Sequence, residues 1–116
     1  MAAANQGARV HRTTMFKIPD PENQKKMLQA YQALAKEQSK DGKPYILFII
    51  AGMAEDDPRS KGYTVVAHTA FASLDDMNYY DSECAAHKTL KKAGASLGVA
   101  EPPLIVYFEG LPTFSK

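Results

Sequence analysis

Four segments of the chain carry the pattern of β-strands, in which β-branched and aromatic residues stand between polar, Pro-containing or Gly-containing turns. They are residues 10–18, 44–54, 63–71 and 104–108. The second and fourth segments are apolar at odd and even positions alike, which is typical of strands that are covered on both faces. In the third, Tyr63, Val65, Ala67 and Phe71 share one side. This pattern predicts a four-stranded sheet.

Apolar residues at helical spacing predict two helices between these strands. The first begins at Pro21, after the potential capping residue Asp20, and ends before the turn at residues 40–43. Its apolar stripe consists of Met27, Leu28, Tyr31, Leu34 and Ala35. The second helix spans residues 74–93, and Gly94 can end it.

The order of these elements is βαββαβ, the arrangement of an α+β, ferredoxin-like domain. Two helices cover only one face of a four-stranded sheet, yet the second and fourth strands carry apolar side chains on both faces. An uncovered apolar face of a sheet usually marks an interface, and its simplest partner is a second copy of the chain. We therefore expect a homodimer that pairs through the β-sheet face.

The length of 116 residues fits one domain. We expect this domain to span residues 9–110, after a disordered leader at residues 1–8 and before a C-terminal tail at residues 111–116. The chain has 14 Lys and Arg against 13 Asp and Glu, a net charge of +1. This balance leaves no broad positive surface and argues against a nucleic-acid partner.

The single cysteine, Cys84, excludes an intrachain disulfide and favours a reducing compartment. Residues 1–8 are not followed by the apolar stretch of a secretory signal. The longest apolar run, residues 46–51, is far shorter than the roughly 20 residues that a membrane span needs. These features predict a cytoplasmic protein without a membrane partner.

Neither a metal site nor a cofactor is predicted. The three histidines, His11, His68 and His87, lack the close spacing of metal ligands. The glycines in residues 94–98 are not accompanied by the Lys of a phosphate-binding loop. Cys84 stands three residues before His87, a helical spacing that can bring the two side chains together, although a lone cysteine on an apolar stripe is typical of a core.

Several short motifs recur in one known family. They are Val10-His11 and Phe16-Lys17 in the first strand, residues 62–64 leading to 71–73 in the third, and residues 79–88 in the second helix. In this order and spacing the chain resembles the stress-responsive dimeric α/β-barrel (Dabb) family, most closely its fungal members. The resemblance implies two ferredoxin-like subunits whose sheets form a shared barrel, each with a small cavity between sheet and helices.

The resemblance also implies candidate site residues. A characterised, more distant relative, plant olivetolic acid cyclase, cyclises a linear polyketide with a Tyr and a His. His87 matches that His, and Tyr80, or else Tyr79, matches that Tyr, although the interval between them is one residue longer here. Tyr31 matches a helix tyrosine near the pocket, and His11 roughly matches a His in the first strand.

The spacing of Tyr80 and His87 decides what these residues can do together. On an unbroken helix they are separated by roughly 10.5 Å of rise, too far for a hydrogen bond. A break at Asp81-Ser82, where either residue can cap a new helix, would bring them closer. His87 would then act as a general base and Tyr80 as a proton donor. In the alternative interpretation, His87 hydrogen-bonds a backbone carbonyl and Tyr80 fills the core.

We therefore expect a stress-responsive α/β-barrel domain protein, a homodimer whose small apolar pocket binds a small hydrophobic molecule. One alternative is a cofactor-independent, polyketide-type cyclase or lyase that uses His87 and Tyr80, and a weaker one is a cofactor-free monooxygenase. The candidate binding residues are His11, Tyr31, Tyr79 and Cys84. The sequence alone leaves enzymatic activity open.

Overall fold

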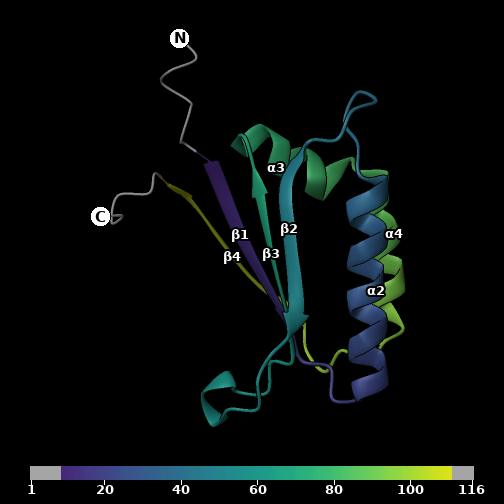
Figure 1. Ribbon diagram of the computed structural model, residues 1–116, viewed down its shortest axis with the longest axis vertical. Helices are drawn as coiled ribbons and strands as arrows, with labels where there is room; N and C mark the ends of the chain where they lie inside the picture. The colour runs from purple at the N-terminus through teal and green to yellow at the C-terminus, as the bar shows by residue number, and fades with distance from the viewer. Residues whose placement is uncertain (1–8, 111–116) are drawn as a thin grey trace.

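The computed structural model describes residues 9–110, and the predicted leader and tail lie outside them. Four antiparallel strands and three helices form an α+β, ferredoxin-like fold, which confirms the predicted class (Figure 1). A short 3₁₀ helix, η1, joins the second and third strands. The elements are β1 (Arg9–Phe16), α2 (Pro21–Glu37), β2 (Ile46–Met53), η1 (Pro58–Ser60), β3 (Val65–Phe71), α3 (Leu74–Ser82), α4 (Ala85–Ala95) and β4 (Leu104–Gly110).

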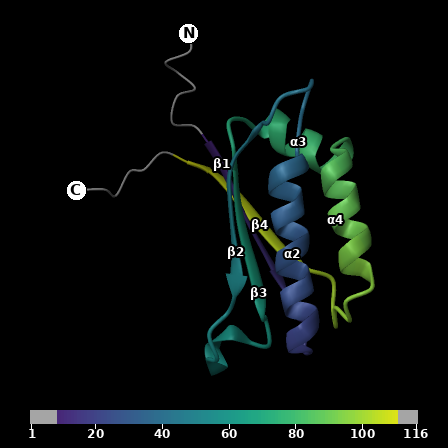
Figure 2. The same cartoon turned by 45° about the vertical axis from the view of Figure 1, so that its right-hand side comes forward.

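The sheet has the strand order β2-β3-β1-β4, so β1 is a central strand and β4 an edge strand. Figures 1 and 2 show all three helices on one side of this sheet, with α2 and α4 beside each other. Side chains alternate along a strand. In β1, the buried residues Val10, Arg12, Thr14 and Phe16 face the helices, and the residues between them face away.

Helix α2 follows its sequence pattern closely. The Asp20 side chain accepts a hydrogen bond of 2.9 Å from the amide of Glu22 and so caps the helix. Met27, Tyr31 and Leu34 are buried against the sheet and α4, as the apolar stripe predicts. This helix fixes one wall of the space between helices and sheet.

The prediction of one unbroken helix over residues 74–93 is wrong. The chain forms two helices there, α3 and α4, that meet at Glu83 and Cys84. Both amides at the junction donate to the carbonyl of Tyr79, at 2.8 and 3.0 Å, and Cys84 is extended. Neither Asp81 nor Ser82 caps the new helix. Asp81 pairs with Arg12 instead, and the Ser82 hydroxyl donates to a backbone carbonyl within α3.

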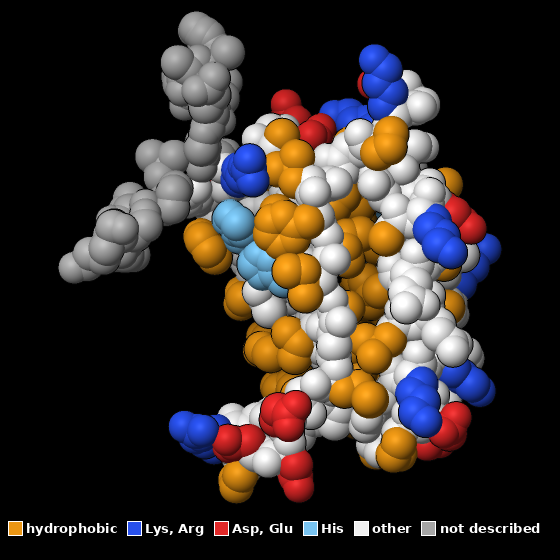
Figure 3. All heavy atoms as spheres, in the orientation of Figure 1, with side chains coloured by type: hydrophobic (Ala, Val, Ile, Leu, Met, Phe, Trp, Pro, Cys, Tyr) orange, Lys and Arg blue, Asp and Glu red, His pale blue; other side chains and the backbone are white. Residues whose placement is uncertain are grey.

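The sheet face opposite the helices is apolar and uncovered within the described residues, as the two-sided strands predict. We call it the open face; its members are His11, Thr13, Phe48, Ile50, His68, Leu104, Val106 and Phe108. Ile50 is 65% exposed and Phe108 60% exposed. Figure 3 shows hydrophobic side chains gathered around the histidine atoms on this side of the molecule. Across the described residues, no helix has the length and apolar character to span a membrane.

Candidate functional site

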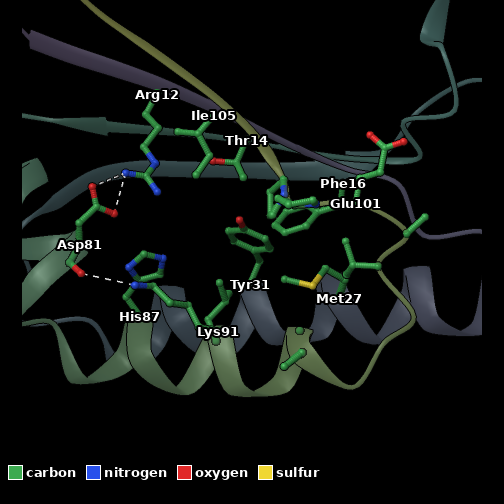
Figure 4. Close-up of a pocket in the computed structure, with 17 residues that line it drawn as sticks. Arg12, Thr14, Phe16, Met27, Tyr31, Asp81, His87, Lys91, Glu101 and Ile105 are labelled. Carbon is green, nitrogen blue, oxygen red and sulfur yellow. Dashed lines mark hydrogen bonds and ion pairs between the residues drawn. The ribbon is translucent and has the colours of Figure 1, made fainter.

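A cavity of about 550 Å³ lies between the sheet and the helices. Its walls come from β1, α2, the end of α3, α4, β4 and the segment that leads into β4 (Figure 4). Most of the wall is apolar; its main hydrophobic members are Phe16, Met27, Leu90, Val99, Pro103 and Ile105. Small-molecule sites in proteins are typically apolar hollows of this size with a few convergent polar groups.

An ion pair stands at one end of the cavity. Arg12 extends from β1 into the interior and is only 4% exposed. Its Nη1 donates to both carboxylate oxygens of Asp81, at 2.8 and 2.7 Å. The guanidinium carbon also lies 5.1 Å from the ring centroid of Tyr80, a cation–π contact. Asp81 therefore holds Arg12 across the gap between α3 and β1.

His87 faces the same end of the cavity from the first turn of α4. Its ring stacks on that of Tyr80, with 3.6 Å between the centroids, and its Nδ1 lies 2.8 Å from the carbonyl oxygen of Tyr80. A carbonyl only accepts, so Nδ1 carries the proton and donates. Nε2 then bears the lone pair, and no group in residues 9–110 hydrogen-bonds to it. The break between α3 and α4 makes this contact possible.

Burial keeps His87 neutral. The side chain is 5% exposed, and loss of hydration lowers its pKa to about 4. The Tyr80 carbonyl opposes this shift, while the positive charges of Lys91 and Arg12 add to it. At neutral pH the ring thus offers an uncharged nitrogen lone pair.

Tyr31 is the tyrosine that shares the cavity with His87. It extends from α2 toward the centre of the cavity, beneath Thr14 (Figure 4). Burial raises the pKa of Tyr31 far above its ordinary value, although the charge of Arg12 opposes the shift. The phenol therefore keeps its proton and can donate a hydrogen bond to an oxygen in the cavity.

The other candidates predicted from the sequence lie outside the cavity wall. Tyr80 stacks behind His87 and is buried in the core, where burial raises its pKa. The Tyr79 hydroxyl donates to the carbonyl of Ser39 at 3.1 Å. Cys84 is fully buried in the core beside the helix junction.

His11 faces away from the cavity, on the open face. Its Nδ1 lies 3.0 Å from Nε2 of His68, within hydrogen-bonding distance. Phe108 stacks on the His11 ring and Phe48 on the His68 ring, with centroid distances of 5.3 and 5.4 Å. The structure thus brings His87 and Tyr31 into one cavity and separates them from His11 by the sheet.

Sequence reasoning missed Arg12, Asp81 and Lys91, which all line the cavity. One signal for Arg12 was present: it alternates with Val10, Thr14 and Phe16, so a charged residue occupies the side of the strand that faces the core. Buried charges are normally paired, and this position implied an acidic partner. In residues 9–110, no group of three or more His, Cys, Asp or Glu side chains is arranged to hold a metal ion.

Comparison with known protein families and with curated proteins identifies one family. The model of the stress responsive A/B barrel domain, Dabb, matches residues 10–98. A Gibberella zeae protein described as a fusaristatin A biosynthesis cluster protein is 51% identical over 84 residues, which cover 72% of this chain and 61% of that protein. The chain thus spans less than two thirds of that relative's length.

Solved structures agree on the fold. A dimeric ferredoxin-like protein from a Jannaschia species has a TM-score of 0.69 at 16% identity, over 88% of this chain and 99% of that one. The hydroxynitrile lyase of Passiflora edulis has a TM-score of 0.72 at 13% identity, over 94% of this chain and 99% of the lyase. SnoaB, a cofactor-independent oxygenase from Streptomyces nogalater, has a TM-score of 0.66 at 12% identity, over 94% of this chain and 99% of SnoaB. At these identities the likeness concerns the fold alone.

The resemblance noted in the sequence is therefore confirmed, because the family model covers more than half of the chain. This protein belongs to the stress responsive A/B barrel domain (Dabb) family.

Proposed function

We propose that this protein is a homodimer that binds a small, mainly apolar molecule in the cavity between its sheet and helices. The observation that carries the proposal is the cavity itself, about 550 Å³ with mostly apolar walls and a polar cluster at one end. Burial of apolar surface would drive binding, and the polar end would orient the ligand.

The exposed apolar surface of the open face supports the proposed dimer. Ile50, Val106 and Phe108 leave a broad apolar surface that would be costly to hydrate in an isolated chain. Three solved structures with this fold, including the Jannaschia protein, are described as dimeric. The open face and the cavity are on opposite sides of the sheet, so pairing leaves the cavity available.

The single buried Cys84 is consistent with the predicted cytoplasmic location.

A substitution that fills the cavity tests the binding proposal. Gly94 lines the cavity, and a Cβ added there would lie 3.5 Å from Met27, an ordinary contact. We expect Gly94→Leu to fold, since leucine favours helices more than glycine does. Its side chain would occupy space that a ligand needs. Thr89→Leu, exposed on the same helix, is the matched control.

The measurement is titration of the neutral fluorescent probe Nile red into each dimeric protein. We expect the wild type and Thr89→Leu to bind alike, and Gly94→Leu to bind at least tenfold more weakly. Equal binding by wild type and Gly94→Leu would place the probe elsewhere and contradict the proposal. Circular dichroism of each variant checks that its fold is intact.

Cofactor-independent proton transfer is the second candidate, favoured by the free Nε2 of His87 and the Tyr31 hydroxyl in one cavity. In this reaction Nε2 takes a proton from the carbon α to a carbonyl, and the electron pair moves to the oxygen as an enolate. Tyr31 hydrogen-bonds that oxygen. The enolate carbon then attacks a second carbonyl, and imidazolium returns the proton to the new alkoxide. Tyr80 contributes by stacking on His87.

This candidate ranks second because a pKa of about 4 makes His87 a weak base at neutral pH. Turnover of a linear triketone tests it, because the aldol product loses its new hydroxyl group as water and enolises to an aromatic ring whose absorbance can be followed. We expect activity to disappear in His87→Gln; equal turnover by this variant would exclude His87 as the base. The third hypothesis, cofactor-free monooxygenation, has only likeness of fold in its favour, to SnoaB and to two structures described as putative antibiotic biosynthesis monooxygenases.

A further inference from the structure

We propose that the ligand carries a carboxylate, and that Arg12 binds it at the polar end of the cavity. This inference rests on the proposed binding function and adds the chemical class of ligand: a small monocarboxylic acid with an apolar body. Three features of the cavity carry it. They are the unused donors of Arg12, the balance of charge around them, and the position of the apolar walls.

The guanidinium of Arg12 has donors left over. Both of its hydrogen bonds to Asp81 come from Nη1, and no group in residues 9–110 accepts from Nε or Nη2. Figure 4 shows the terminal nitrogen that is not bound to Asp81, Nη2, turned toward the cavity, above His87. Nε and Nη2 form one edge of the guanidinium, and two parallel N–H groups on such an edge match the two oxygens of a carboxylate.

This arrangement differs from that of a purely structural ion pair. Arg12 is 4% exposed, and buried guanidinium groups normally have their hydrogen bonds satisfied. Asp81 has satisfied one nitrogen and has fixed the side chain in place. The side chain is therefore held rigidly with its free edge toward the cavity, and little conformational entropy would be lost when an acid binds there.

The charges near this end also favour an anion. Lys91 lines the cavity, and its Nζ lies 3.4 Å from the backbone carbonyl of Asp81, close to His87. The charges of Lys91 and Arg12 both act on the His87 ring, and the charge that opposes them there is the Asp81 carboxylate. The other acidic side chain of the wall, Glu101, lies at the far end and pairs with Lys17 at 3.2 Å. The polar end thus has two cations and one anion.

The remainder of the cavity suits an apolar body. In Figure 4, Arg12, Asp81 and His87 lie at one end, and Phe16 and Met27 lie toward the other. Tyr31 and Thr14 stand between them as the only hydroxyl groups of the wall within the described residues. A linear acid with its carboxylate at Arg12 would therefore place its chain along Phe16 and Met27.

Octanoate and 1-octanol are matched probes, because they have the same chain and differ in the charged end. Isothermal titration at pH 7.5 and low salt measures both. We expect the wild-type dimer to bind octanoate at least tenfold more tightly than 1-octanol, and Arg12→Gln to bind the two equally. Lys88→Gln, exposed on α4 and outside the cavity wall, should keep the wild-type preference.

Asp81→Asn provides a second variant, in which the amide oxygen can still accept from Nη1 and keep Arg12 in place. Removing the competing carboxylate should raise the preference for octanoate over 1-octanol above that of the wild type. Equal wild-type affinity for the two probes would overturn the carboxylate inference and leave the binding function standing. A preference that survives in Arg12→Gln, or that falls in Asp81→Asn, would overturn the role of Arg12. If neither probe binds to the wild type at millimolar concentration, both the inference and the proposed function fail.

Discussion

The imidazole of His87 lies flat on the phenol ring of Tyr80, with 3.6 Å between the centroids and 11° between the planes. The same histidine donates to the backbone carbonyl of Tyr80 at 2.8 Å. Two residues seven positions apart meet in this way only because the chain leaves the helix after Ser82 and begins a new one at Ala85. The junction therefore sets the orientation of the one histidine in the cavity wall.

This contact uses the ring of Tyr80 and not its hydroxyl, which has no hydrogen-bond partner in residues 9–110. We expect Tyr80→Phe to leave the unfolding free energy and ligand affinity nearly unchanged. Tyr80→Leu should destabilise the fold by about 1–3 kcal/mol, because the stacked ring and part of the core are lost. Urea denaturation and probe titration measure both effects. If Tyr80→Phe alone abolished binding or turnover, a direct role for the hydroxyl would replace the packing role.

The low pKa of His87 makes stability depend on pH. Burial lowers the pKa from 6.5 in the unfolded chain to about 4 in the folded one, so the unfolded chain binds more protons between these values. The stabilisation is fully present above pH 6.5 and is lost as the pH falls toward 4. By pH 5 the loss from this one group is about 2 kcal/mol.

The test compares the unfolding free energies of wild type and His87→Gln at pH 7.5 and pH 5, at one protein concentration. Glutamine cannot titrate, so the variant should lose less stability on acidification, by about 2 kcal/mol. His68 remains in both proteins and cancels in the comparison. An identical loss in both would contradict the burial of a neutral His87.

The strands and helix α2 were predictable because their signals are local, whereas the junction between α3 and α4 was not. The stripe of Met27, Tyr31 and Leu34 and the Asp20 cap define α2 without reference to the rest of the chain. Apolar residues at odd and even positions of β2 and β4 also indicated the uncovered sheet face. Such periodic patterns depend only on the geometry of helices and strands.

The site was harder to predict because it depends on pairs of residues that are far apart in the sequence. Arg12 and Asp81 are 69 positions apart, and their pairing occupies the residue that the sequence offered as a helix cap. His11 precedes Arg12 by one position, and one position in a strand moves a side chain to the opposite face. The resemblance alone did not fix this register. The alternation of Val10, Arg12, Thr14 and Phe16 does fix it, and puts His11 on the open face.

The proposed dimer makes a simple prediction about the open face. Ile50, 65% exposed and opposite His68 on the neighbouring strand, would be buried if two sheets pair. We expect Ile50→Lys to weaken the dimer strongly, because a charge would lose its hydration in an apolar interface. Analytical ultracentrifugation should find twice the 12.7 kDa chain mass for the wild type and the single mass for the variant at micromolar concentration.

Gln29→Lys, which adds the same charge at an exposed position of α2, should remain dimeric. A monomeric wild type would refute the proposed dimer, and a fully dimeric Ile50→Lys would move the interface to another surface.

The histidine pair on the open face predicts that the proposed dimer is sensitive to acid. His11 and His68 share a hydrogen bond between one donor and one acceptor nitrogen, which requires a neutral ring. Burial, and then the charge of His11, lower the pKa of His68 below its ordinary 6.5. The neutral state is thus the one that the folded chain favours. Protonation of His68, which this shift moves to a lower pH, would turn the acceptor into a donor and place charge between Phe48 and Phe108.

We therefore expect the dimer dissociation constant, measured by ultracentrifugation, to rise at least tenfold between pH 7.5 and pH 5.5. His68→Gln keeps a polar group without the titration, so its dissociation constant should change less over the same range. Thr13, whose Oγ1 lies 3.4 Å from Nδ1 of His68, carries no charge in this range. The charged side chains nearest the pair along β1 are Arg9 and Arg12. A wild-type dimer of constant affinity across this range would show that the histidine pair does not lie in the interface.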